Sequence, residues 1–218
     1  MISTRHLIPF LLILLMTISA NASEDWRIRV DEQVKLSRTA MRADTAGVLT
    51  ISIMLKKNGD EKDRDSTLTR LFCEGDVQVN EALNDDGLWE EISREHSPAD
   101  EVRESSLLSM FDVRNSEVFT LTEGGYDDDS HLIVTFEPVY PADSLYTGVA
   151  HIDTSAWFPV RMEMTMSELP DQVKEMAMVA VFERDGDGVY RPSTISTDGH
   201  AKWLLLNFYF RTETQFKW

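Results

Sequence analysis

The sequence predicts a mostly β protein of the α+β class, in which helices pack on one face of an antiparallel sheet. The composition is that of a globular domain, with 42% hydrophobic residues, 27% charged residues, 10 Gly and 7 Pro, and it excludes collagen-like and disordered chains. From Val118 onward, strand-like stretches are separated by turn signals instead of long helices. Strands joined by short turns pair antiparallel. One amphipathic helical pattern precedes them near the start of the chain.

The first 22 residues have the pattern of a secretory signal peptide. Arg5 precedes the 12 residues from Leu7 to Ile18, which are largely apolar, and Ala20-Asn21-Ala22 follows. A membrane-spanning helix needs about 17 to 25 apolar residues, so this run is too short for one. We therefore expect cleavage after Ala22, a periplasmic protein that does not span the membrane, and a single domain over residues 23–218.

The charge of the chain excludes one class of partner. It has 38 acidic and 21 basic residues, for a net charge of -17. Such a field repels phosphate backbones, so we expect no nucleic-acid partner. Cys73 is the single cysteine, which excludes an intramolecular disulfide and leaves the core to stabilise the fold.

The first half of the mature chain predicts a helix, a hairpin and a covering segment. Trp26, Val30 and Val34 recur every four residues and predict an amphipathic helix over Ser23–Arg42. Strands over Val48–Leu55 and Thr67–Cys73 flank the turn signal Asn58-Gly59-Asp60, and a third strand is expected at Val77–Val79. The run Ser97-Pro98-Ala99-Asp100 is typical of a helix start. We expect residues 88–111 to lie across the sheet.

The second half predicts seven strands with turns between them, the last beginning after a break at Asp198-Gly199. The expected ranges are Val118–Thr122, Leu132–Glu137, Tyr146–Asp153, Val160–Met166, Met176–Glu183, Val189–Ser196 and Ala201–Arg211. The acidic runs Asp127-Asp128-Asp129 and Asp185-Gly186-Asp187-Gly188 lack the pattern of a calcium loop and are expected at hairpin tips.

Methionines gather on two of these strands. Methionine is flexible and polarizable, so a row of it suits a surface that accommodates variable apolar ligands. Filling of a packed core is the alternative interpretation, and the sequence does not decide between them. As lining of a ligand cavity we predict the same-parity residues Met162, Met164, Met166, Met176, Met178 and Phe182.

Two strand segments resemble those of a known family. They are Gly148-Val149-Ala150-His151-Ile152-Asp153-Thr154 and Trp157-Phe158-Pro159-Val160-Arg161-Met162-Glu163, with Phe136-Glu137-Pro138 before them and Tyr190-Arg191-Pro192 and Gly199 after them. The chain resembles the LolA-like periplasmic lipoprotein-carrier superfamily, the outer membrane lipoprotein-sorting type. The resemblance covers Val113 to Trp218, and the first half matches only in the order of its elements.

This resemblance implies a curved, incompletely closed antiparallel β barrel, with helices covering a concave side that takes acyl chains or another apolar ligand. It also implies an inner-membrane exporter or an outer-membrane acceptor as partner. It brings no catalytic residue. In the motif, Asp153 is expected to shape a turn, and Pro159 to sit at a strand start where its missing N–H is tolerated.

No nucleotide-binding or hydrolase motif occurs in the sequence. His131, His151 and Asp153 have a spacing that zinc could use, but no Cys or Glu-rich motif completes a ligand set. We therefore predict no metal, no cofactor and no enzymatic activity. The leading hypothesis is a carrier or chaperone for lipid or lipoprotein acyl chains. The alternative is an envelope protein-interaction or sensor module that uses the same curved sheet without a bound lipid.

Overall fold

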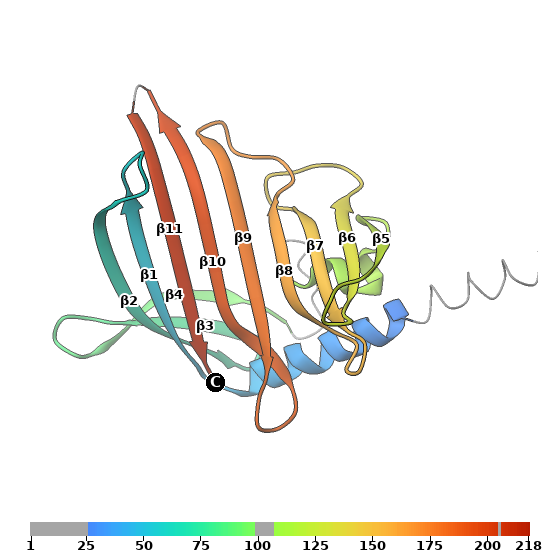
Figure 1. Ribbon diagram of the computed structural model, residues 1–218. Helices are drawn as coiled ribbons and strands as arrows, with labels where there is room; N and C mark the ends of the chain where they lie inside the picture. The colour runs from blue at the N-terminus through green and yellow to red at the C-terminus, as the bar shows by residue number, and fades with distance from the viewer. Residues whose placement is uncertain (1–25, 99–106, 205) are drawn as a thin grey trace, which may run out of the picture.

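A computed structural model describes residues 26–98, 107–204 and 206–218, and its main feature is one antiparallel sheet of eleven strands (Figure 1). The strands are β1 Ala46–Leu55, β2 Glu61–Glu74, β3 Val77–Leu83, β4 Trp89–His96, β5 Phe119–Tyr126, β6 Leu132–Pro138, β7 Tyr146–Asp153, β8 Phe158–Met166, β9 Val173–Arg184, β10 Tyr190–Trp203 and β11 Leu206–Lys217. Their order in the sheet is β4-β3-β2-β1-β11-β10-β9-β8-β7-β6-β5. Because β4 and β5 lie at its edges, the curved sheet does not close into a barrel.

One α-helix, over residues 26–43, is present among the described residues, and it runs along one end of the strands (Figure 1). Two short 3-10 helices follow β4, η2 Ser109–Phe111 and η3 Val113–Asn115. The predicted fold class, an open antiparallel half-barrel with helical cover, is confirmed. The first helix and the β1–β2 hairpin are also confirmed, with β2 beginning earlier, at Glu61.

The core lies between the helix and strands β5 to β9. Trp26, Val30 and Val34 pack in one cluster of buried residues with the inward rows of these strands. The segment after β4 contributes Leu108, Met110 and Phe111 to the same cluster, which confirms the expected cover for the end of the 88–111 segment. Trp26, Val30 and Val34 follow one another at intervals of four, so the first half of the helix presents an apolar stripe to the sheet.

Two strand boundaries predicted from the sequence are wrong. Asp198-Gly199 does not break the chain, because both residues lie inside β10. The reversal falls instead between Trp203 and Leu206, where Leu204 has a φ of 55°. The strand predicted over Val118–Thr122 extends to Tyr126, so Gly124-Gly125 lies inside β5, where the register shifts and Gly125 takes a φ of 94°. Glycine permits a bulge as readily as a turn, and sequence alone does not separate the two.

The stretch after residue 88 is also corrected. Residues 89–96 do not lie across the sheet; they form β4, which pairs with β3 at the sheet edge. The helix predicted after Ser97 falls largely on residues 99–106, outside the described residues. The predicted signal peptide lies outside them as well. Within the described part of the chain, no helix combines the length and apolar character needed to cross a bilayer.

Candidate functional site

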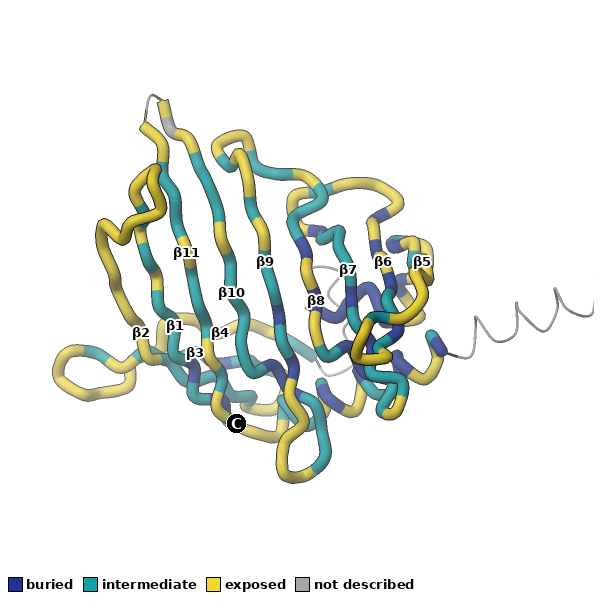
Figure 2. Tube along the Cα trace, viewed as in Figure 1, coloured by how far each residue is buried: buried dark blue, intermediate teal, exposed yellow. Residues whose placement is uncertain are grey.

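The sheet has a covered half and an open half, which differ in burial (Figure 2). The covered half consists of β5 to β9. It contributes buried residues that are all 0% exposed, such as Val134, Phe136, Ala150 and Met162. In the open half, β10, β11 and β1 to β4, no residue of β2, β4 or β11 is buried. In β1 and β3, Ala46, Val48 and Val79 are buried, whereas Met54 at the other end of β1 is 37% exposed. The cover therefore reaches only part of the concave face, and the face around Met54 is accessible.

The six predicted site residues divide between these environments. Met162, Met164 and Phe182 are 0%, 5% and 4% exposed and belong to the packed core. Met178 is half-buried and packs against that core, whereas Met166 and Met176 are half-buried and stand outside the buried cluster. The structure thus brings all six onto the helix side of two neighbouring strands, and only the last three lie where the cover ends.

A close backbone contact fixes the covered half. A Cβ atom on Gly148 of β7 would lie 2.1 Å from the backbone oxygen of Glu163 on β8. Because the contact is with backbone, a larger residue at this position cannot be accommodated by rotating a side chain. Glycine at 148 therefore has a packing reason, and the resemblance motif that begins with it is structural here.

The register extends the methionine face across the open half. Met176 of β9 lies beside Gly199 of β10, which pairs with Phe210 of β11. Phe210 in turn pairs with Met54 of β1. Residues of one cross-strand row share a face, so this row continues the face on which Ala180 of β9 packs in the core. The next row holds Met178, Thr197, Thr212 and Ser52.

The Phe210 ring lies very close to the backbone of Gly199. A Cβ atom placed on Gly199 would lie 2.2 to 2.8 Å from atoms of the Phe210 ring. The end of the ring therefore lies over the glycine. We call the accessible face formed by these two rows the open groove.

A pocket of about 200 Å³ lies at the β1–β2 end of the open groove. Met54, which is 37% exposed, and Phe210 supply its apolar surface, and Ser52 and Thr212 supply hydroxyl groups. Sequence reasoning missed Met54 and Phe210 because their alignment with the methionines depends on the β1–β11 pairing, which joins the two ends of the chain. The alternation in residues 48–55 was the only local signal for Met54.

The motif residues of the predicted resemblance lie at the other end of the sheet and have structural roles. Asp153 accepts a hydrogen bond from the Ser155 amide at 2.8 Å, as expected of a turn-forming residue, and another from the Tyr190 hydroxyl at 2.9 Å. Burial raises the pKa of Asp153, but these hydrogen bonds outweigh it and the net direction is downward. Tyr190 also stacks on Phe158, with ring centroids 4.8 Å apart. These contacts hold the turns together and leave no group for chemistry.

Arg191, whose side chain is 4% exposed, forms an ionic cluster with three carboxylates. Its guanidinium lies 2.6 Å from Asp44 after the helix and 2.7 Å from Asp187 in the β9–β10 turn, and a third carboxylate, Asp185, is 3.3 Å away. Hydrogen bonding by Arg191 holds the pKa of Asp187 at about 2. The predicted hairpin tip at 185–188 is thus confirmed as a turn, and it anchors the helix end to the sheet.

His131, His151 and Asp153, whose spacing in the sequence zinc could use, do not converge on one point. His151 and His131 each place Nδ1 near the same Asp127 oxygen, at 2.8 and 3.3 Å, while Asp153 contacts Tyr190. Among the described residues, no group of three His, Cys, Asp or Glu side chains is arranged to hold a metal ion.

With this geometry in place, comparison with known proteins gives similarity in fold only. No family model and no curated protein matches the sequence. Among solved structures, the chain is similar to a LolA superfamily protein from Nitrosomonas europaea, at 10% identity and a TM-score of 0.47, covering 86% of this chain and 90% of the other. A putative outer membrane lipoprotein-sorting protein domain from Vibrio parahaemolyticus matches at 11% identity and a TM-score of 0.43, over 88% and 91%.

A DUF1329 family protein from Desulfovibrio piger also matches, at 13% identity and a TM-score of 0.44, over 90% of each chain. The chain is thus similar in fold to LolA-type proteins, which is the resemblance that its motifs predict. At these identities the similarity concerns the arrangement of elements and says nothing about a ligand.

Proposed function

We propose that the protein is a non-enzymatic periplasmic carrier or chaperone that binds an acyl chain or another apolar ligand in the open groove. The observation that carries this proposal is the row of Met176, Phe210 and Met54 over Gly199, because it is apolar, concave and left uncovered by the helix. A soluble domain gains free energy when a ligand removes such a surface from water, at about 25 cal/mol per Å² of apolar area.

In this proposal the six predicted residues have two tasks. Met166, Met176 and Met178 form ligand-contacting floor, where methionine adapts to chains of different shape. Met162, Met164 and Phe182 form the packed base on which that floor rests. The binding surface then extends beyond the predicted set to Phe210 and Met54. The protein would receive its ligand from an exporter in the inner membrane and deliver it to a receptor in the outer membrane.

The experiment is a binding titration with the neutral fluorescent probe N-phenyl-1-naphthylamine. The wild type should bind it, and Met176→Glu should weaken binding at least tenfold while the far-ultraviolet circular dichroism is unchanged. The matched control is Met110→Leu, a conservative change in the core away from the groove, which should leave probe binding unchanged. A folded Met176→Glu variant that binds the probe like the wild type would remove this surface from the site, and a protein-interaction module would then be the better description.

A further inference from the structure

We propose that the open groove selects amphiphiles that carry a positive charge next to the apolar chain. This inference deepens the function proposed above and rests on it. The observation behind it is that both rows of the groove end on a carboxylate. Asp63 of β2 pairs with Met54, and Asp65 pairs with Ser52. Because Asp63 and Asp65 are two residues apart on one strand, they share the face of the groove.

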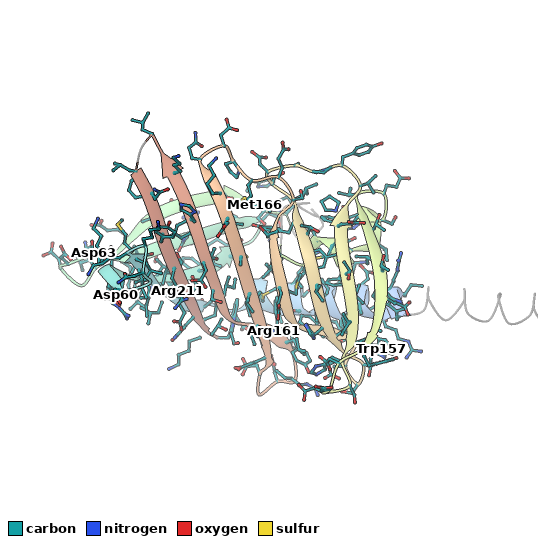
Figure 3. The ribbon with its side chains drawn as sticks, turned by 45° about the horizontal axis from the view of Figure 1, so that its top comes forward. Asp60, Asp63, Trp157, Arg161, Met166 and Arg211 are labelled. Carbon is teal, nitrogen blue, oxygen red and sulfur yellow. The ribbon has the colours of Figure 1, made fainter. Side chains whose placement is uncertain are left out.

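Both carboxylates line the same pocket as Met54 and Phe210, and Arg64 and Arg211 line it as well. Figure 3 shows Asp63 at the β1–β2 end of the sheet, on the left, and Met166 nearer its middle. Strands are about 4.8 Å apart, so the row from Met176 on β9 to Asp63 on β2 extends over about 19 Å. An extended chain lying along this row would place its head group beside Asp63 and Asp65.

These two carboxylates have no cation among the described residues. Each accepts one local backbone hydrogen bond, Asp63 from the Arg64 amide at 3.0 Å and Asp65 from the Ser66 amide at 2.8 Å. The two arginines nearby are already committed, since Arg64 forms a two-pronged contact with Glu61 and Arg211 lies 2.8 Å from Asp198. Arg211 and Arg64 pair with Ile53, in the row of opposite parity, although both also line the pocket.

At this end of the groove the two aspartates therefore carry unpaired negative charge, whereas the two arginines of the same pocket are each paired with another carboxylate. A cationic head group docked beside two carboxylates gains Coulomb energy, whereas an anionic head group at the same place is repelled. Because the site is accessible to solvent, the effect is moderate and salt-sensitive, and we expect a preference of about tenfold for a cation over an anion at low ionic strength.

The test compares three amphiphiles with the same 12-carbon chain and different head groups: dodecyltrimethylammonium, dodecyl maltoside and dodecanoate. Each is titrated below its micellar concentration against wild-type protein loaded with N-phenyl-1-naphthylamine at pH 7. The cation should displace the probe at about tenfold lower concentration than dodecanoate, with the maltoside between them, and 0.5 M NaCl should reduce this preference.

In Asp63→Asn/Asp65→Asn, the three amphiphiles should compete within about twofold of one another, while the affinity for the neutral probe is unchanged. The matched control is Asp85→Asn/Asp86→Asn in the turn between β3 and β4, which changes the net charge equally and should keep the preference. Equal competition by cation and anion in the wild type would overturn the inference. So would a preference that survives in the Asp63/Asp65 variant or is lost equally in the control.

Failure of the carrier function gives a different result. If the wild type does not bind the neutral probe, the apolar floor is not a ligand site, whatever the head group. Dodecyltrimethylammonium is then titrated directly by calorimetry. If the wild type releases heat of binding and Asp63→Asn/Asp65→Asn does not, the cation site is supported although the carrier function is not. If the wild type shows no heat of binding, both the cation site and the carrier function are overturned.

Discussion

The covered and open halves of the sheet differ in side-chain packing although the strands of both are hydrogen-bonded to their neighbours. Strands β10 and β11 are paired along ten positions without a register shift, yet no residue of β11 is buried. The shorter strands β6 and β7 carry fully buried residues on the helix side. Hydrogen bonding thus builds both halves, while the helix decides which half becomes core. In a carrier, the half that lacks cover is the half that can bind.

The largest expected effect is a loss of stability when glutamate replaces a methionine of the covered half but not one of the open half. Met162→Glu places a carboxylate without a partner in the core and should cost about 3 to 5 kcal/mol of unfolding free energy, enough to unfold a marginal domain. Met176→Glu introduces the same group at the groove and should change the free energy by less than about 1 kcal/mol, because the carboxylate stays hydrated.

Urea denaturation followed by tryptophan fluorescence measures both values. Met162→Leu serves as the control for changing the residue without adding charge. Equal destabilisation by the two glutamates would mean that the groove is packed in solution, and the division into halves would fail.

A second comparison uses two glycines and is smaller. Gly148→Ala forces a Cβ against the Glu163 carbonyl and should cost about 3 kcal/mol, because backbone must shift. Gly199→Ala meets only the end of the Phe210 ring, which can swing aside, so its cost should stay below about 1 kcal/mol.

Probe binding adds an independent measurement. Gly199→Ala should weaken binding of the neutral probe, because the displaced ring obstructs the groove. A folded Gly199→Ala variant with normal binding would show that the Phe210 position is irrelevant to the ligand.

The third prediction concerns a buried carboxylate of the covered half. The Asp112 side chain is 0% exposed and lies 2.9 Å from Arg114 and 3.2 Å from Arg38 of the helix. Burial raises the pKa of Asp112, but the hydrogen bonds and charges of these arginines outweigh it and hold the pKa at about 2. Asp112→Asn should therefore cost about 2 kcal/mol at pH 7.

The sign of the pH dependence follows from the lowered pKa. A group whose pKa is lower in the folded state stabilises the fold above its unfolded pKa of about 4, and this contribution is lost as the pH falls to about 2. Wild type and Asp112→Asn should therefore differ most above pH 4 and converge near pH 2. A constant difference across this range in acid denaturation would contradict the assignment.

The difference between the halves also explains what the sequence could predict. Periodicity in the helix and alternation in β8 are local, so the apolar face of each element followed from its own segment, but whether that face is packed core or cavity did not. The open groove combines β9, β10, β11 and β1, and it depends on pairing between Met54 and Phe210, which lie far apart in the chain. The misassigned break at Gly199 hid the same row, because a glycine under an aromatic ring and a glycine in a turn look alike in sequence.

The smallest expected effect tests whether hairpin tips follow the same division. The β5–β6 tip is tied to β7, because Asp127 contacts His151 at 2.8 Å as well as His131 within the tip. The hydrogen bond of His151 lowers the pKa of Asp127 most, burial opposes it, and contacts with His131 add to it, leaving the pKa at about 2. At the β1–β2 tip of the open half, Asn58 bonds only to its neighbour Asp60, at 2.7 Å, among the described contacts.

Asp127→Asn should therefore speed amide hydrogen exchange in residues 127–131 at pH 6, where the carboxylate is charged, and the effect should fade as the pH approaches 2. Asn58→Ala, the matched change at the open-half tip, should alter exchange only within that turn. Exchange is followed by NMR, because both changes fall below the resolution of a denaturation curve. If Asp127→Asn left the exchange of its tip unchanged at pH 6, the contact with His151 would not restrain the hairpin, and the tip of the covered half would be as free as that of the open half.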